Sequence, residues 1–198
     1  GLRLDDEAVR VAVGLRLGAI LREPHKCPCG SDVDADGTYG LACRRSSGRT
    51  SRHHVINDLI WRSLLRADIP AIKEPAGLLR SDGKRPDGLT QIPWQSRDVT
   101  VTDTRAESYL ASTSTVAGGA AEGAASRKEM YQSLARTNTF IPLAFETLGP
   151  INSKGITFFN ELGRRLSACS GDSRETSYLY QRLSIVIQRL TASASMAA

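Results

Sequence analysis

Three of the four cysteines lie in one short segment that is also rich in histidine and glycine. Cys27 and Cys29 are separated by one residue, and Cys43 follows fourteen positions after Cys29. Zinc takes four soft or borderline ligands in a tetrahedron, usually as a close pair on a turn and a second pair from further along the chain. The segment therefore predicts a zinc site with Cys27, Cys29 and Cys43 as three of its ligands.

The fourth zinc ligand is predicted to be a histidine. His53 stands just before an expected helix, a common position for a last ligand, and His54 and His25 are the alternatives. Three thiolates and one imidazole would close the tetrahedron, so this zinc would be structural. The competing interpretation is three unrelated buried thiols on a basic loop. Zinc is favoured because the segment has almost no apolar residues with which to fold.

Arginines surround these candidate ligands. A group of four follows the third cysteine: Arg44, Arg45, Arg49 and Arg52. They could form a solvated basic loop, but the chain carries a formal net charge of +5 and has a sequence pI near 9.2. That charge favours a polyanionic partner, because lysine and arginine displace counterions from phosphates. We therefore predict that these arginines, together with Arg85, contact nucleic-acid phosphates.

Asp87 and Asp98 form the second candidate centre. Each lies beside a short apolar stretch with strand character, and the two are eleven positions apart. Carboxylates from two neighbouring strands can share one Mg²⁺, which takes oxygen ligands and keeps several waters. Such a cation can activate a water for attack on a phosphodiester. Aspartates at this spacing also occur in surface turns, but the flanking strands and the basic composition favour a metal site.

Two further requirements complete the predicted acidic centre. Glu74 lies one expected strand earlier and could supply a third carboxylate. A lysine is needed nearby, to orient the attacking water or to stabilise the charge of the pentacovalent phosphorus.

The elements that would position these residues alternate between helices and strands. Apolar spacing predicts helices over residues 4–21, 55–67, 120–136, 153–168 and 173–190, and strands over residues 71–79, 89–94, 98–102 and 140–145. This order predicts an α/β domain with a small mixed sheet flanked by helices, preceded by a zinc-binding loop module. A capping box at Asp172 and Glu175 is expected to start the last helix, and the tail from Thr191 is expected to be frayed.

The totals fit one compact domain with a small appendage. The chain has 198 residues, of which 40% are hydrophobic and 24% charged, so a real core is possible. No apolar run is long enough for a membrane span, and the start of the chain has no signal-peptide layout. The cysteine pattern does not indicate disulfides, so we expect an intracellular protein. Cys169 is expected to be a small core residue.

Several segments, read together, resemble a known family. They are EPHKCPCG (23–30), RHHVIND (52–58), DGKRPDG (82–88) and DVTV (98–101). They look like the C-terminal part of the protein encoded by site-specific non-LTR retrotransposons, where a reverse transcriptase is followed by a Cys/His zinc knuckle and a restriction-like endonuclease of the PD-(D/E)XK fold. The resemblance covers nearly the whole chain, including ETLGP (146–150) and ELGRR (161–165).

This resemblance implies a domain organisation, cofactors and a reaction. Residues 1–24 would end a region linked to the reverse transcriptase, residues 25–54 would form the zinc-knuckle-like module, and residues 55–198 would form the endonuclease domain. Asp87 and Asp98 would bind a catalytic Mg²⁺, and Zn²⁺ would be structural. The nuclease would nick chromosomal DNA in the nucleus, and the freed 3′ hydroxyl would prime reverse transcription of the element's RNA.

Two departures from the family's pattern bear on catalysis. Ten residues separate Asp87 from Asp98, a shorter segment than is usual in the family. The family's basic residue, which can stand just before a tyrosine, is displaced here, because Met130 precedes Tyr131 and the nearest lysine is Lys128. Lys128 is therefore the candidate catalytic lysine. The alternative function is a catalytically decayed module that still binds nucleic acid.

Overall fold

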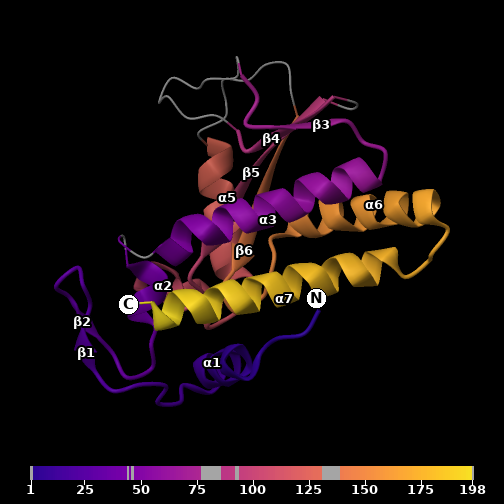
Figure 1. The fold of residues 1–198 in the computed structure, drawn as a ribbon. Coiled ribbons are helices and arrows are strands. Elements are labelled where there is room, and N and C mark those ends of the chain that lie inside the picture. The colour runs from indigo at the N-terminus through magenta and orange to yellow at the C-terminus, as the bar shows by residue number, and fades with distance from the viewer. Residues whose placement is uncertain are drawn as a thin grey trace.

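A four-stranded mixed sheet forms the centre of the molecule (Figure 1). The computed structural model describes residues 2–43, 45, 47–76, 86–91, 94–130 and 139–197, with Ser47, Arg49, Trp94 and Met130 described by their backbone alone. The strands, in their order across the sheet, are β3 (Ala71–Lys73), β4 (Gly88–Gln91), β5 (Trp94–Thr102) and β6 (Thr139–Glu146). The pairs β3–β4 and β4–β5 are antiparallel, whereas β5 and β6 are parallel.

Helices cover both faces of this sheet. They are α1 (Asp6–Leu17), α2 (Tyr39–Ala42), α3 (Ser47–Arg66), the 3-10 turn η1 (Glu107–Tyr109), α4 (Leu110–Thr113), α5 (Gly119–Met130), α6 (Ser153–Ser170) and α7 (Glu175–Met196). The parallel pair β5–β6 requires a crossover connection, and α5 lies within it. The predicted α/β class, with a small mixed sheet flanked by helices, is confirmed. No helix in the described part of the chain is both long and apolar enough to span a bilayer.

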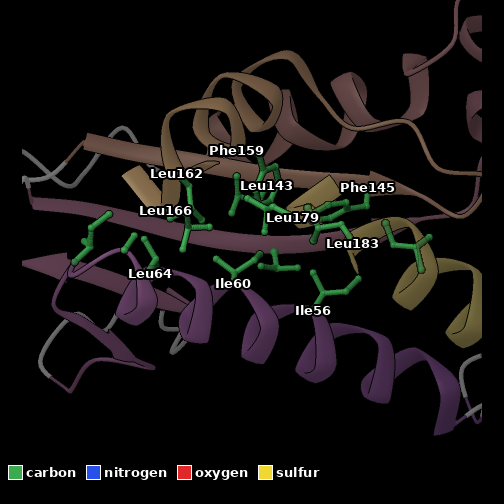
Figure 2. Close-up of a cluster of buried hydrophobic side chains, with 14 residues drawn as sticks. Ile56, Ile60, Leu64, Leu143, Phe145, Phe159, Leu162, Leu166, Leu179 and Leu183 are labelled. Atoms are coloured by element: carbon green, nitrogen blue, oxygen red, sulfur yellow. The ribbon is translucent and has the colours of Figure 1, made fainter. Parts of the chain in front are cut away.

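The main core lies between the sheet and the helices α3, α6 and α7. Figure 2 shows Ile56, Ile60 and Leu64 of α3 pointing toward the sheet, at the four-residue spacing that places side chains on one helix face. Leu143 and Phe145 of β6 belong to the same cluster, whereas Ala144 between them packs against α5. Because neighbouring strand residues face opposite ways, α5 lies on the other side of the sheet.

A small module at the N-terminal end docks on the last turns of α7. It contains the two-stranded sheet of β1 (His25–Lys26) and β2 (Asp32–Val33), followed by α2. Ser195 donates a hydrogen bond of 2.8 Å to the carbonyl oxygen of Gly37, and Ala192 and Ala194 are buried beside α1. A Cβ on Gly40 would come within 2.4 Å of the Ala194 carbonyl oxygen, so the backbones of α2 and α7 are in close contact.

Four local expectations need correction. The helix α3 begins at Ser47 rather than at residue 55, which places His53 inside the helix and moves the boundary expected at residue 54 into its middle. The capping box of α7 does not form, because Glu175 pairs with Arg66 instead. The tail is helical to Met196, since the docked module buries it, and Cys169 is exposed.

Replacing Phe159 by alanine tests this core. Phe159 is fully buried and its ring contacts those of Phe145, Phe158 and Tyr180. We expect a loss of about 3–5 kcal/mol in the free energy of unfolding, because the cavity left between helix and sheet can collapse only in part. Urea denaturation measures it. Phe158→Ala, at a partly exposed position on the same helix, should cost clearly less, and equal losses would contradict the assigned packing.

Candidate metal centre

Asp87 and Asp98 meet at one place, as the sequence predicted. Their carboxylate oxygens and a ring nitrogen of His53 all lie within 4.8 Å of one another. Lys128 lies beside them, with its Nζ atom 2.8 Å from Oδ2 of Asp98. These four residues come from three separate places in the fold: α3, α5 and the β4–β5 hairpin.

The register of the β4–β5 hairpin explains this meeting. At the end of the hairpin away from the turn, the last pair of the ladder is Gly88 of β4 with Arg97 of β5. The edge of β5 beyond Arg97 is therefore not paired with β4. The Asp87 side chain fills the start of that edge, where its Oδ2 accepts a hydrogen bond of 2.5 Å from the backbone N–H of Val99. Side chains from both faces of the sheet can therefore reach Asp98 at this point.

Helix α3 holds residue 87 at two points. His53 Nε2 lies 2.9 Å from Oδ2 of Asp87, and Asn57 Nδ2 donates a hydrogen bond of 3.1 Å to the carbonyl oxygen of the same residue. His53 and Asn57 are four positions apart and so share one face of the helix. The neighbouring Ile56 is fully buried in the main core, which fixes the helix against the sheet.

Helix α5 brings Lys128 to Asp98 from the other face. Its buried side chains are those of alanines (Ala120, Ala121, Ala124 and Ala125), whose small size allows the helix to lie close to β6. The buried carboxylate of Glu146 accepts hydrogen bonds of 2.9 and 3.1 Å from the first free N–H groups of α5, at Ala120 and Ala121. This contact fixes the start of the helix, and Lys128 follows two turns later.

The two carboxylates differ in pKa. Burial works against the ionised form of Asp87, but the hydrogen bond and charge of His53 and the N–H of Val99 outweigh it and lower the pKa below its usual value. Burial and the charge of Asp87 raise the pKa of Asp98, and Lys128 opposes that rise. The negative charge of one carboxylate therefore opposes ionisation of the other, and a divalent cation between the two carboxylates would relieve this repulsion.

Arg97 adds a buried positive charge that the sequence reasoning missed. It is 1% exposed, and its three guanidinium nitrogens have no hydrogen-bond partner among the described residues. The guanidinium lies over Gly88, where a Cβ would come within 2.3 Å of Cζ, so only glycine leaves it room. Burial lowers the pKa of Arg97 to about 10, against the opposing charge of Asp87. At neutral pH the group therefore stays charged.

Glu74 does not join the acidic centre. It is exposed, and its carboxylate is absent from the cluster formed by Asp87, Asp98 and His53. Its contribution is through the backbone: a φ of 43° turns the chain, and its N–H donates a hydrogen bond of 3.2 Å to the carbonyl oxygen of Asp87. The structure therefore does not bring the predicted third carboxylate, that of Glu74, to Asp87 and Asp98.

The three thiols also come together. Cys27, Cys29 and Cys43 lie within 4.8 Å of one another, and the Sγ atoms of Cys27 and Cys43 are 3.7 Å apart. A tight turn positions the first two, because the N–H of Gly30 donates to the carbonyl oxygen of Cys27 at 2.8 Å and Gly30 takes a φ of 95°. Three thiolates at this separation fit the ligand set of a tetrahedral zinc.

The fourth side chain at the thiol cluster is Tyr39, which the sequence reasoning missed. Its hydroxyl oxygen lies 2.9 Å from Sγ of Cys29. This contact and the backbone of Ser31 lower the pKa of Cys29 to about 6, which favours the thiolate. Tyr39 is the first residue of the short helix α2, and Cys43 follows the last residue of that helix. The four-residue spacing places both residues beside the turn that carries Cys27 and Cys29.

None of the three candidate histidines lies in the thiol cluster that the structure describes. His53 was predicted as the fourth zinc ligand, but it pairs with Asp87 because α3 begins earlier than expected. His54 is exposed, and its ring meets that of His53 edge-on. His25 is also exposed, with Nδ1 lying 3.0 Å from the carbonyl oxygen of Glu23.

The predicted phosphate-binding arginines have different environments. Arg45 is exposed, and its guanidinium donates a hydrogen bond of 3.4 Å to the carbonyl oxygen of Pro28 beside the thiols. Arg52 is 3% exposed and donates a hydrogen bond of 3.0 Å to the carbonyl oxygen of Leu41, so it joins α3 to α2 and does not face solvent. Arg44, Arg85 and the side chain of Arg49 lie outside the described residues.

Comparison of the chain with known protein families and with curated protein sequences finds no match.

Stability of the metal-free protein should depend on pH through His53. The hydrogen bond to Asp87 raises the pKa of His53 despite partial burial, so the stabilisation is complete below about pH 6.5 and is lost as the pH rises through the folded-state pKa. Asp87, with its lowered pKa, contributes above about pH 4 and loses that contribution as the pH falls through its folded-state value.

We therefore expect His53→Gln to lose about 1 kcal/mol of unfolding free energy near pH 5.5 and less near pH 8.5. Urea denaturation in a chelating buffer measures this difference. His54→Gln, which removes an exposed neighbouring imidazole, should show no such pH dependence. A loss for His53→Gln that is the same at both pH values would argue against the charged pair.

Proposed function

We propose that this chain is a divalent-cation-dependent DNA endonuclease that nicks its target. The main support is the meeting of Asp87, Asp98 and Lys128, from separate elements, in one partly buried corner. The two carboxylates offer the oxygen ligands that Mg²⁺ takes, and water and a phosphate oxygen can complete its coordination. When bound there, Mg²⁺ would supply Lewis acidity and an activated water.

The chain's own residues have distinct roles in this proposal. In hydrolysis, the oxygen of a water bonds to phosphorus, the P–O3′ bond breaks, and the departing oxygen takes up a proton. Asp87 and Asp98 would hold the cation, and the backbone contacts of Asp87 keep its carboxylate in place. Lys128 has a flexible four-carbon stem, so its ammonium can turn from Asp98 to a phosphate oxygen and stabilise the charge that develops there.

The resemblance to retrotransposon proteins supports chromosomal DNA as the substrate. On this proposal the nick would be made in the nucleus and would prime reverse transcription of the element's RNA by an attached reverse transcriptase. The net charge of +5 favours binding to either nucleic acid, and on this proposal Arg45, which is exposed beside the thiol cluster, would contact phosphates.

Purified protein is expected to nick supercoiled plasmid in the presence of Mg²⁺. Asp87→Asn should reduce the rate at least about 100-fold, because it removes a cation ligand while keeping the size of the side chain. Gel electrophoresis of the plasmid forms measures the rate. Asp68→Asn is the matched control: it removes the same charge at an exposed position with a φ of 54°, which asparagine tolerates.

Nicking that persists unchanged in Asp87→Asn would show that Asp87 is not part of the centre. DNA binding that weakens steeply with salt, without nicking by the wild type, would instead favour the alternative of a catalytically decayed nucleic-acid-binding module.

A structural zinc at Cys27, Cys29 and Cys43 is the second part of the proposal. The close thiols and the thiolate-favouring surroundings of Cys29 fit that ion. The hydroxyl of Tyr39 lies beside Cys29, and a phenol is an uncommon zinc ligand whereas an imidazole is a common one.

Elemental analysis should find about one zinc per chain, and Cys29→Ser should lose it, because a hydroxyl binds zinc far less well than a thiolate. The exposed Cys169→Ser should retain it. Tyr39→His should keep its zinc at higher chelator concentrations than the wild type. A folded wild-type protein with no zinc would exclude this site.

A further inference from the structure

The imidazole of His53 occupies a position that the endonuclease proposal does not use. It is 2.9 Å from Asp87 and shares a cluster with both carboxylates. We propose that His53 Nε2 is the third protein ligand of the cation held by Asp87 and Asp98, and that this mixed site takes Mn²⁺ in preference to Mg²⁺. The inference rests on the proposed cation site, but it does not require that DNA be cleaved there.

The separations agree with a shared cation. Two neighbouring ligands of an octahedral ion, each about 2.1 Å from it, are about 3 Å apart. Nε2 of His53 and Oδ2 of Asp87 are 2.9 Å apart, so both can bind one ion with little movement. The third ligand atom, on Asp98, lies within 4.8 Å of the others and needs a modest side-chain shift once Lys128 releases it.

The surroundings of His53 favour a fixed ligand over a mobile surface pair. Its side chain is two-thirds buried, at 32% exposure. One turn later, Asn57 ties the same helix face to the backbone of Asp87. This hydrogen bond of Asn57 therefore holds the imidazole of His53 and the carboxylate of Asp87 relative to each other without using a polar atom of either group.

The types of ligand atom determine which metal ion the site favours. Mg²⁺ and Ca²⁺ select oxygen ligands, whereas an imidazole nitrogen suits the first-row transition ions. Two carboxylates and one imidazole therefore combine the ligands of both groups. Mn²⁺ accepts such a mixture while keeping the octahedral coordination and bound water that phosphodiester hydrolysis uses.

Pulsed electron paramagnetic resonance of bound Mn²⁺ tests the inference directly, because a coordinated imidazole nitrogen modulates the electron spin echo. We expect this modulation in the wild type, its loss in His53→Gln, and its retention in His54→Gln, which changes the adjacent exposed ring. In titrations with Mn²⁺ and Mg²⁺, His53→Gln should lower the ratio of the two affinities at least about tenfold. His54→Gln should leave that ratio unchanged.

The possible failures separate the two proposals. Mn²⁺ that binds the wild type without nitrogen modulation, and no longer binds Asp87→Asn, would overturn the role of His53 and leave the carboxylate site standing. Failure of the wild type to bind either cation would overturn both proposals. Nitrogen modulation in a protein that does not nick DNA would support the ligand and count against the nuclease.

Discussion

The burial of two carboxylates beside each other is the constraint on which the rest of this structure depends. Unit charges about 4 Å apart repel by about 4 kcal/mol at an effective dielectric constant of about 20. Carboxylate oxygens of Asp87 and Asp98 lie within 4.8 Å of each other, and both side chains are largely removed from water. Three cationic side chains, from α3, α5 and β5, offset the repulsion: His53, Lys128 and Arg97. The packing of α3, α5 and β5 holds these three cationic side chains in place.

Helix α3 connects the thiol cluster to the acidic centre. It starts four residues after Cys43, and Arg52 in its second turn bonds to Leu41 at the end of α2. His53 follows immediately, and Ile56 then enters the main core (Figure 2). The Arg52 hydrogen bond therefore ties the first turns of α3 to α2, the helix that carries Tyr39 and is followed by Cys43.

The acidic pair was predicted from its context, which is the flanking strands and the basic composition, and the thiols from their spacing in a segment with almost no apolar residues. The sequence could not place His53, because the expected start of α3 was eight residues too late and the histidine was assigned to the nearer cysteines. Arg97 was missed because an arginine in a strand normally faces solvent. Only the pairing with Gly88 makes room for the Arg97 side chain inside the fold, and this strand register is a feature of the tertiary structure that the sequence pattern does not give. Tyr39 was missed because a phenol is an uncommon zinc ligand.

The hairpin register also bears on the short segment between the two aspartates. Gly88 pairs with Arg97, and Gln91 with Trp94, so Asp87 and Asp98 are the next opposite positions in the same register. Removing equal numbers of residues from both strands moves the turn toward the aspartates, and adding them moves it away, but either change keeps the aspartates opposite each other. Shortening therefore does not by itself separate the acids. Lys128 reaches Asp98 because the alanine face of α5 brings the helix close to the sheet and the long stem of the lysine spans the remaining distance.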